Sequence, residues 1–408
     1  MRLRLCGAFV VLIVGGLAFP SGARAQVELP EESSPLNAVK RLFCANFDGS
    51  QFFADNVGGG AVITPVSTNL VNSFLFQSQT FPNVSSAAGF TFSWVGGAPV
   101  ASELYGPLFG ERATTNGRKK LSATLNFQQL DWATYDDQEI RISRDGLDWG
   151  DLDPGGLVPS DPYVGVCKLN IRSRVLMLAL NYGLTDDLDI SAGIPLVTTS
   201  VSGTSQFDAA GSVAVGNLPP RAFAASGEAT GIGDVGISLK YGVVSSGPLT
   251  VALKGGVALG TGSADKMTGT GQTVLSGLAA AGWESGPVSI HGQLGYSASR
   301  GEADEAIPLG VNVFDEVSYV LGLDYAAIPE RLTLGTELVA RHLIDTPGFD
   351  GSSLTATTDS INVYFISVGG KVRVVERVLL TSYLLIPAGN QGLLPQRPSF
   401  NLGLNHVF

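Results

Sequence analysis

Charged residues, cysteine and methionine are all scarce in this sequence. Charged side chains make up 15% of the 408 residues, and cysteine and methionine occur three times each, whereas about 25% of the residues in a typical soluble domain are charged. The formal net charge is −11. It argues against nucleic acid as a partner and against a basic membrane-surface helix, because both need a positive surface. Glycine, by contrast, occurs 52 times, and this composition favours many glycine-punctuated strands with small side chains.

Long apolar runs are lacking after the N-terminus. The chain starts with Arg2 and Arg4, an apolar core over Gly7–Phe19 and the small residues of Ala23–Ala25, which together predict an export signal over residues 1–25. A single membrane anchor is the alternative, although this apolar core is shorter than the ~18 residues of a membrane-spanning helix. No later segment reaches that length, yet the mean hydropathy is +0.24. An exported, hydrophobic chain without helical spans predicts the other structure that a bilayer accepts, a closed β-sheet.

The last ten residues alternate between the two faces of a strand. Every second residue from Phe400 to Phe408 is apolar except His406, while Ser399, Asn401, Gly403 and Asn405 on the other face are polar or small. A membrane barrel strand needs about ten residues with lipid-facing apolar side chains in this pattern. The same period recurs at Leu121–Gln128, Leu188–Val197, Gly231–Val243, Leu249–Leu259, Val288–Ser297, Val317–Tyr325 and Leu332–Arg341.

Short and long connections alternate between these strands. The short ones are Thr185-Asp186, Ser245–Pro248, Glu284–Pro287, Ala327–Glu330 and Glu376-Arg377. The long ones are Tyr135–Asn170, Val201–Ala229, Thr261–Gln272, Arg300–Asn312, Ile344–Asp359 and Gly389–Pro398. This alternation predicts an all-β fold, a transmembrane up-and-down antiparallel barrel of about 12 strands over residues 119–408, with the short turns in the periplasm. The weakest strand predictions are Gln272–Trp283, where three alanines blur the faces, and Leu379–Ile386, which is apolar on both.

Three short motifs resemble a known family. They are Leu180–Asp189 followed by Gly193-Ile194-Pro195, Thr230–Val235 leading into Leu239-Lys240-Tyr241, and Phe109–Arg112. Over roughly Leu121 to Phe408 the chain resembles the outer-membrane proteins of the meta-pathway phenol-degradation family, distant relatives of the long-chain fatty-acid and toluene channels. The resemblance implies location in a Gram-negative-type outer membrane and import of small hydrophobic or aromatic compounds. It also implies that the C-terminal Phe408 is the signal read by the barrel-assembly machinery.

The region before the barrel, residues 26–118, contains the fewest sequence patterns that predict a structure. It contains Phe52, Phe53, Phe90, Phe92 and Trp94 among other aromatic residues, too many for a disordered tail. The fatty-acid channels carry an N-terminal plug inside the barrel, so the resemblance implies a plug here. A periplasmic cap and additional barrel strands remain alternatives.

The functional surface of such a barrel is its lumen. The alternation assigns a polar set to the lumen: Asp189, Asp234, Lys240, Lys254, His291, Gln293, Asp324, Glu337, Arg341, Lys371 and Arg373. Both signs of charge are present, so these residues predict no strong ion selectivity; they either line a solute path or pair with one another. Ile361, Val363 and Phe365 share the face of Lys371 and Arg373. This apolar patch would suit a hydrophobic ligand or pack against the N-terminal region.

Catalysis, a cofactor and a metal site are not predicted. The three histidines have no serine at a nucleophile spacing, and Gly231-Ile232-Gly233 lacks the third glycine of a dinucleotide site, so its glycines predict a bend in the barrel. The acidic run Asp145–Asp153 does not follow an EF-hand pattern and predicts a solvated loop. Cys44 and Cys167 either form one disulfide in an oxidising compartment or remain separate thiols.

The sequence therefore predicts a channel for passive uptake of small hydrophobic or aromatic compounds, occluded to some degree by residues 26–118. Its partners would be outer-membrane lipid, the barrel-assembly machinery and a small hydrophobic ligand. The alternative function is a non-conducting structural or adhesive barrel that acts through long extracellular loops, and an outer-membrane enzyme is a more distant one.

Overall fold

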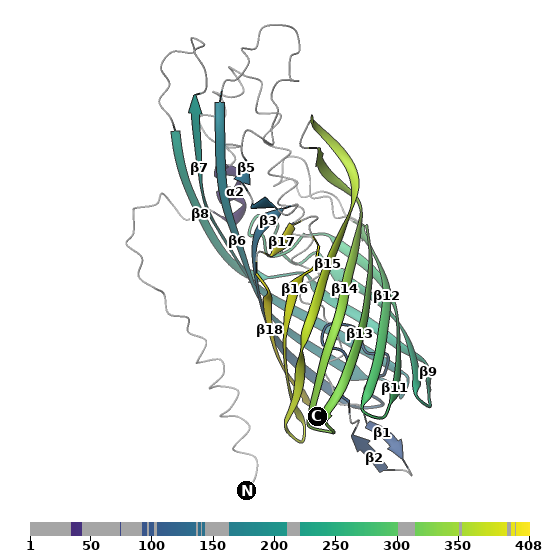
Figure 1. Cartoon of the computed structure of the whole chain (residues 1–408). Coiled ribbons are helices and arrows are strands. Elements are labelled where there is room, and N and C mark those ends of the chain that lie inside the picture. The colour runs from purple at the N-terminus through teal and green to yellow at the C-terminus, as the bar shows by residue number, and fades with distance from the viewer. Residues whose placement is uncertain are drawn as a thin grey trace. The chain divides into compact units, whose positions relative to one another are not determined.

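A computed structural model gives the structure of the chain (Figure 1). It describes residues 34–42, 74, 92–95, 98–101, 104–135, 138–139, 141–142, 163–209, 221–300, 315–350, 353–389, 393–395 and 397–408. These residues belong to one compact unit, Ser33–Phe408. The predicted export signal, Cys44 and the acidic run Asp145–Asp153 lie outside the described residues, so the signal and the disulfide stay predictions.

Twelve of the described strands close an antiparallel barrel (Figure 1). Around the barrel they are β3 (Leu121–Tyr135), β6 (Tyr163–Gly183), β7 (Leu188–Ala209), β9 (Val235–Ser246), β10 (Leu249–Leu259), β11 (Thr273–Ser285), β12 (Val288–Arg300), β13 (Asp315–Ile328), β14 (Leu332–Asp350), β15 (Ser353–Val375), β16 (Val378–Pro387) and β18 (Ser399–Val407). The barrel closes where β18 pairs with β3, for example Leu404 with Leu125. The predicted barrel and its strand number are thus confirmed, including β11 and β16, the two weakest predictions.

The other elements are short or lie beyond the barrel wall. They are α2 (Pro35–Leu42), the hairpin of β1 (Phe92–Val95) and β2 (Ala98–Ala101), β4 (Gln138–Glu139), β5 (Arg141–Ile142), β8 (Arg221–Ile232) and β17 (Leu393–Pro395). None of the helices in the described ranges is long and apolar enough to cross a membrane.

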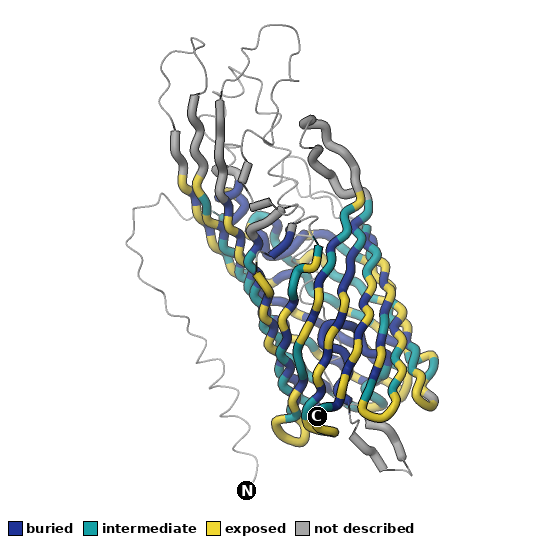
Figure 2. Tube along the Cα trace, viewed as in Figure 1, coloured by how far each residue is buried: buried dark blue, intermediate teal, exposed yellow. Residues whose placement is uncertain are grey.

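The strands alternate between buried and exposed residues because one face lines the lumen and the other faces lipid (Figure 2). In β18, Ser399, Asn401 and Asn405 are buried, while Phe400 and Leu402 are exposed. Unpaired backbone groups are costly in a bilayer, and closure of the sheet leaves none along the wall. The alternation predicted from the sequence therefore follows directly from the two different surroundings of the barrel wall.

Two predicted loops are largely strand, which corrects the expectation from sequence. β7 runs on to Ala209 and β8 begins at Arg221, so only a short part of Val201–Ala229 is a connection. Likewise β14 and β15 extend through most of Ile344–Asp359. On the described part of the β7–β8 extension, one face stays buried at Val201 and Ala225, while the other carries exposed polar residues such as Ser202 and Glu228. The outward apolar residues that mark a barrel strand are therefore missing there.

Candidate functional site

A segment that precedes the first barrel strand lies inside the lumen. We call Leu104–Asn116 the inner segment. Tyr105, Phe109 and Glu111 donate backbone N–H groups to side chains on β14 and β12, and Asn116 donates one to β7. Since these strands come from different sides of the closed sheet, the segment is enclosed by the wall. Most of its residues are buried.

The inner segment leaves the lumen through a tight turn at the short-turn end. Gly117 has a φ of +82° and Lys119 a φ of +61°. The Lys119 N–H donates to the Gly183 carbonyl at 2.8 Å, and the Gly183 N–H donates to the Lys120 carbonyl at 2.9 Å. A Cβ atom on Gly183 would lie 1.9 Å from the Gly117 oxygen. This close approach explains the glycine in the Asn181-Tyr182-Gly183 motif. Burial lowers the pKa of the Lys120 ammonium here, and the Asp186 carboxylate opposes this effect.

Gly183 therefore offers a test of the turn. We expect Gly183→Val to lower the free energy of unfolding by about 2–4 kcal/mol, because the side chain overlaps the backbone of the turn. The measurement is thermal unfolding followed by the mobility shift of the folded barrel in gels. Gly255→Val is the matched control, since a Cβ on Gly255 meets nothing within 4 Å; equal losses in the two variants would contradict the prediction.

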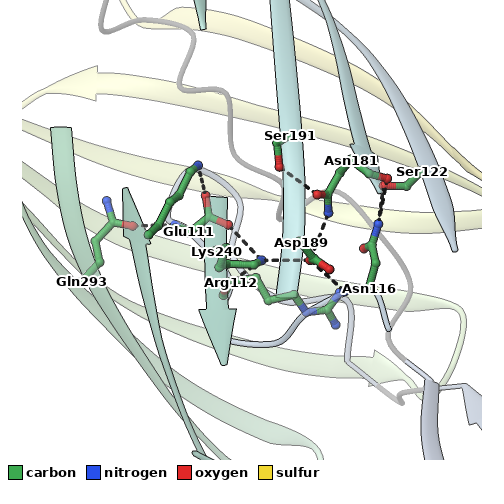
Figure 3. A network of polar contacts seen from close by, with 10 residues as sticks. Glu111, Arg112, Asn116, Ser122, Asn181, Asp189, Ser191, Lys240 and Gln293 are labelled. Carbon is green, nitrogen blue, oxygen red and sulfur yellow. Dashed lines mark hydrogen bonds and ion pairs between the residues drawn. The ribbon is translucent and has the colours of Figure 1, made fainter. Parts of the chain in front are cut away.

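A buried carboxylate anchors the middle of the inner segment (Figure 3). Glu111 Oε1 lies 3.2 Å from Lys240 Nζ and its Oε2 lies 2.6 Å from Lys254 Nζ. The Glu111 N–H donates to Gln293 Oε1 at 2.5 Å, and Lys240 also lies 3.9 Å from Asp189. The Glu111 side chain is only 1% exposed. Two ammonium groups, from β9 and β10, thus converge on one carboxylate of the inner segment.

A second carboxylate, on the barrel wall, holds the adjacent backbone. Glu337 accepts N–H groups from Phe109 at 2.7 Å and Gly110 at 3.1 Å. His291 lies between two acids, with Nε2 3.1 Å from Glu337 and Nδ1 at an ion-pair distance of 3.1 Å from Asp324. The carboxylate of Glu337 is therefore held by the wall on one side and binds the segment on the other.

The β10–β11 connection, residues 260–272, folds toward the barrel wall and is held by Asp234. Asp234 Oδ1 accepts the Gly262 N–H at 2.8 Å, and Oδ2 accepts the N–H and the hydroxyl of Thr270 at 3.0 and 2.9 Å. At its tip Met267 is fully buried, and its carbonyl accepts the hydroxyl of Thr199 at 2.7 Å. The helix α2 contacts the same tip through a bond from Leu36 N–H to Asp265 C=O. A connection predicted as an outer loop thus packs against the barrel interior.

A cavity of about 260 Å³ lies between the inner segment and this connection. Phe109 borders it from the inner segment and Thr268 from the connection. The apolar part of its wall is made of Val175, Met177, Val197, Val320 and Val339, and another part is made of the small residues Gly236, Ser238, Gly256 and Ser276. The charged residues Asp234, Lys254, Glu316 and Arg341 also border it. It is a concave, mostly apolar space with a few polar groups, which is the usual form of a small-molecule site.

Several solved structures are similar to this chain over most of its length. An outer membrane channel from Pseudomonas putida F1 is 16% identical with a TM-score of 0.48, and the match covers 73% of this chain and 99% of that one. A deletion variant of TodX, a monoaromatic hydrocarbon channel, is 10% identical with a TM-score of 0.32, covering 71% and 90%. A FadL homologue from Pseudomonas aeruginosa is also 10% identical with a TM-score of 0.32, covering 71% and 90%. These are outer-membrane proteins. At such identities and TM-scores the likeness assigns neither a family nor a substrate.

Two other comparisons give no assignment. No family model matches the chain, and no curated protein matches it.

Most of the predicted lumen residues are buried on the inner face of the barrel. Asp189, Lys240, Lys254, Gln293 and Glu337 all meet the inner segment. Their role as a substrate path stays a prediction, because the structure shows them binding the protein's own chain.

The remaining predicted residues have other surroundings. Arg341 forms a two-pronged pair with Glu316 at 2.8 and 2.6 Å, and Arg373 pairs with Glu330 at 3.3 Å beside a short turn. Lys371 donates to the Tyr105 carbonyl at 3.3 Å. The apolar set of Ile361, Val363 and Phe365 packs in the main hydrophobic cluster of the lumen.

Sequence reasoning missed the part played by Glu111. It stands in the Phe109–Arg112 motif, which was singled out only by resemblance, and no periodicity marks it. A charged Glu111-Arg112 pair directly after the mostly apolar Leu104–Gly110, shortly before the first strand, was the available signal. Among the described residues, no group of histidine, cysteine or acidic side chains is placed to hold a metal ion.

Proposed function

We propose that this protein is a passive outer-membrane channel for small hydrophobic or aromatic compounds. The observation that carries the proposal is the mostly apolar cavity between the inner segment and the β10–β11 connection. The lumen of a general porin is a polar, water-filled passage, whereas valine and methionine side chains form much of the wall of this cavity. The resemblance of Leu180–Asp189 and Thr230–Val235 to the meta-pathway phenol-degradation family supports the aromatic part of the proposal.

In this proposal the inner segment acts as the plug of a closed state. Residues 26–118 form the pre-barrel region that contains it, and the barrel domain follows. The lumen charges hold the plug and do not themselves select ions. Phe408, exposed at the end of the closing strand, serves the barrel-assembly machinery, and the apolar outer face contacts outer-membrane lipid. No catalytic step is part of the proposal.

Filling the cavity tests the function directly. Gly236 lines the cavity, and a Cβ atom there meets nothing within 4 Å. We expect Gly236→Phe to lower uptake of N-phenyl-1-naphthylamine by Gram-negative cells about tenfold. The added ring occupies the cavity, and a ligand that enters beside it overpacks the site at a cost of ~1–3 kcal/mol. The matched control is Gly255→Phe, which places the same ring on open space at the outer face. Uptake that is unchanged in a folded Gly236→Phe variant would contradict the proposed path.

One observation favours a second candidate function, an adhesive barrel. The strands β6, β7 and β8 continue as a ribbon beyond the barrel, and β14 and β15 continue as a hairpin (Figure 1). Such extended edges suit a protein partner that adds a strand. Cells that bind a surface through the protein but show no uptake of the aromatic probe would favour this candidate over the channel.

A further inference from the structure

The lumen wall is divided into a charged part and an uncharged part. Seven strands, β7, β9, β10 and β12 to β15, each point a charged residue or histidine inward: Asp189, Lys240, Lys254, His291, Asp324, Glu337 and Lys371. The four strands around the barrel closure, β16, β18, β3 and β6, differ. In the described positions of these four strands whose side chains are buried on the inner face, no residue is charged.

Neutral amide and hydroxyl groups form a continuous patch on the uncharged part. We call this set the seam patch: Asn126, Gln128, Ser173, Thr381, Ser399 and Asn401. Gln128 on β3 stands directly opposite Asn401 on β18, and Asn126 and Thr381 flank Gly403 in the next row. Directly opposite side chains on one face lie about 5 Å apart. The groups of the patch are therefore close enough to contact one ligand together.

Most polar side-chain atoms of the seam patch are buried and have no hydrogen-bond partner among the described residues. Gln128, Ser173 and Asn401 are fully buried and Ser399 is 2% exposed. In the part of the chain that the structure describes, neither amide atom of Gln128 or Asn401 has a partner, and neither has the hydroxyl of Ser173 or Ser399. Each such group loses its hydration without compensation, and buried groups of this kind call for an explanation. A ligand that supplies donors and acceptors would remove this cost.

The seam patch adjoins the apolar cavity. Val175 and Met177 on β6 line the cavity. Their direct partners on β3 are Gln128 and Asn126, two members of the patch. The seam patch therefore lies beside the apolar part of the cavity wall, one strand spacing of about 4.8 Å away, and is not itself part of the cavity lining.

We propose that the seam patch and the adjoining cavity bind an uncharged amphiphile. Its head carries hydroxyl or amide groups and bonds Gln128 and Asn401, and its apolar tail lies against Val175 and Met177. This inference deepens the proposed channel function and rests on it, because it names the substrate class of the same lumen. A carboxylate or ammonium head is disfavoured at the seam patch, because no counter-charge lies on it and the charge would lose its hydration uncompensated. The cations that line the cavity, Lys254 and Arg341, already pair with Glu111 and Glu316.

Probes that share one tail and differ in head charge test the inference. The full mature chain in lipid nanodiscs is dialysed against labelled hexyl β-D-glucoside, hexanoate or hexylammonium, and uptake by empty nanodiscs is subtracted. We expect the glucoside to bind about tenfold more tightly than either charged probe, as follows from one or two hydrogen bonds of ~1 kcal/mol each. Naphthalene, which lacks a polar head, reports on the apolar cavity alone.

Substitutions in the patch locate the binding. Gln128→Leu and Asn401→Leu should each lower glucoside binding about threefold to tenfold and leave naphthalene binding unchanged. Gln129→Leu, the next residue on β3, points to the other face and is the matched control. Gln128→Glu keeps the shape and adds a charge, so it provides a second variant, and it should weaken glucoside binding as well.

The outcomes separate this inference from the proposed function. If the protein binds naphthalene and also binds all three hexyl probes with equal affinity, the seam-patch inference is overturned and the channel proposal stands. Glucoside preference that survives both leucine variants and Gln128→Glu would also overturn it. Absence of all binding, naphthalene included, would overturn both proposals.

Discussion

Replacing Glu111 with glutamine is expected to raise the open probability of the refolded protein in planar bilayers at least tenfold. The substitution leaves the Lys240 and Lys254 ammonium groups facing a neutral side chain. Breaking a buried ion pair from one side costs about 3–5 kcal/mol, and each 1.4 kcal/mol is tenfold in an equilibrium. The cost falls on the state in which the inner segment is docked, because water can hydrate both lysines once the segment leaves.

The control for this variant is Glu228→Gln. Glu228 lies exposed on β8, so the variant has the same change of net charge outside the docked network. It should conduct like the unaltered protein. If Glu111→Gln folds and its conductance stays at the unaltered level, the lumen charges do not hold a plug, and their role must be sought in the rigidity of the barrel.

Deletion of residues 26–118 is expected to have a still larger effect on conductance. The deletion removes the inner segment and keeps every barrel strand, since β3 begins at Leu121. With the segment gone, water fills the lumen and the charged wall strands become hydrated, so ion flow should rise well above that of the Glu111→Gln variant. The full mature chain, measured in the same bilayers, should show low conductance.

The deletion also tests whether the protein is a channel at all. A folded barrel without residues 26–118 that remains silent would exclude a pore, and attention would move to the strand extensions of β6, β7 and β8. High conductance in both forms would contradict the plug and would leave a permanently open channel.

The resemblance motifs of the sequence acquire physical reasons in the structure. Gly183 allows the turn of the inner segment to pass the barrel rim. Gly233 allows close approach of Thr268 and Pro195, whose atoms would lie 2.9 and 3.0 Å from a Cβ, and Asp234 beside it binds the β10–β11 connection. The bend predicted for Gly231–Gly233 coincides with the break between β8 and β9. None of these roles could be derived from the motifs themselves.

The lumen assignments show the same limit. Alternation placed Asp234 and Arg373 on the inner face together with Lys240 and Glu337. Their contacts differ, because Asp234 holds a loop, Arg373 reaches Glu330 beside a short turn, and Lys240 and Glu337 bind the inner segment. Which face a side chain takes follows from local periodicity. Which group it meets there depends on strand tilt and on residues hundreds of positions away.

The sequence by itself determined the barrel. Each strand such as β18 must present apolar side chains to lipid and polar ones to the lumen. Because this requirement applies to successive residues of one strand, it produces an alternation that can be identified in the sequence. Only the tertiary structure decided what fills the lumen. The inner segment has no regular period of its own, and its path is set by Lys240, Lys254 and Glu337, which come together only when the sheet closes.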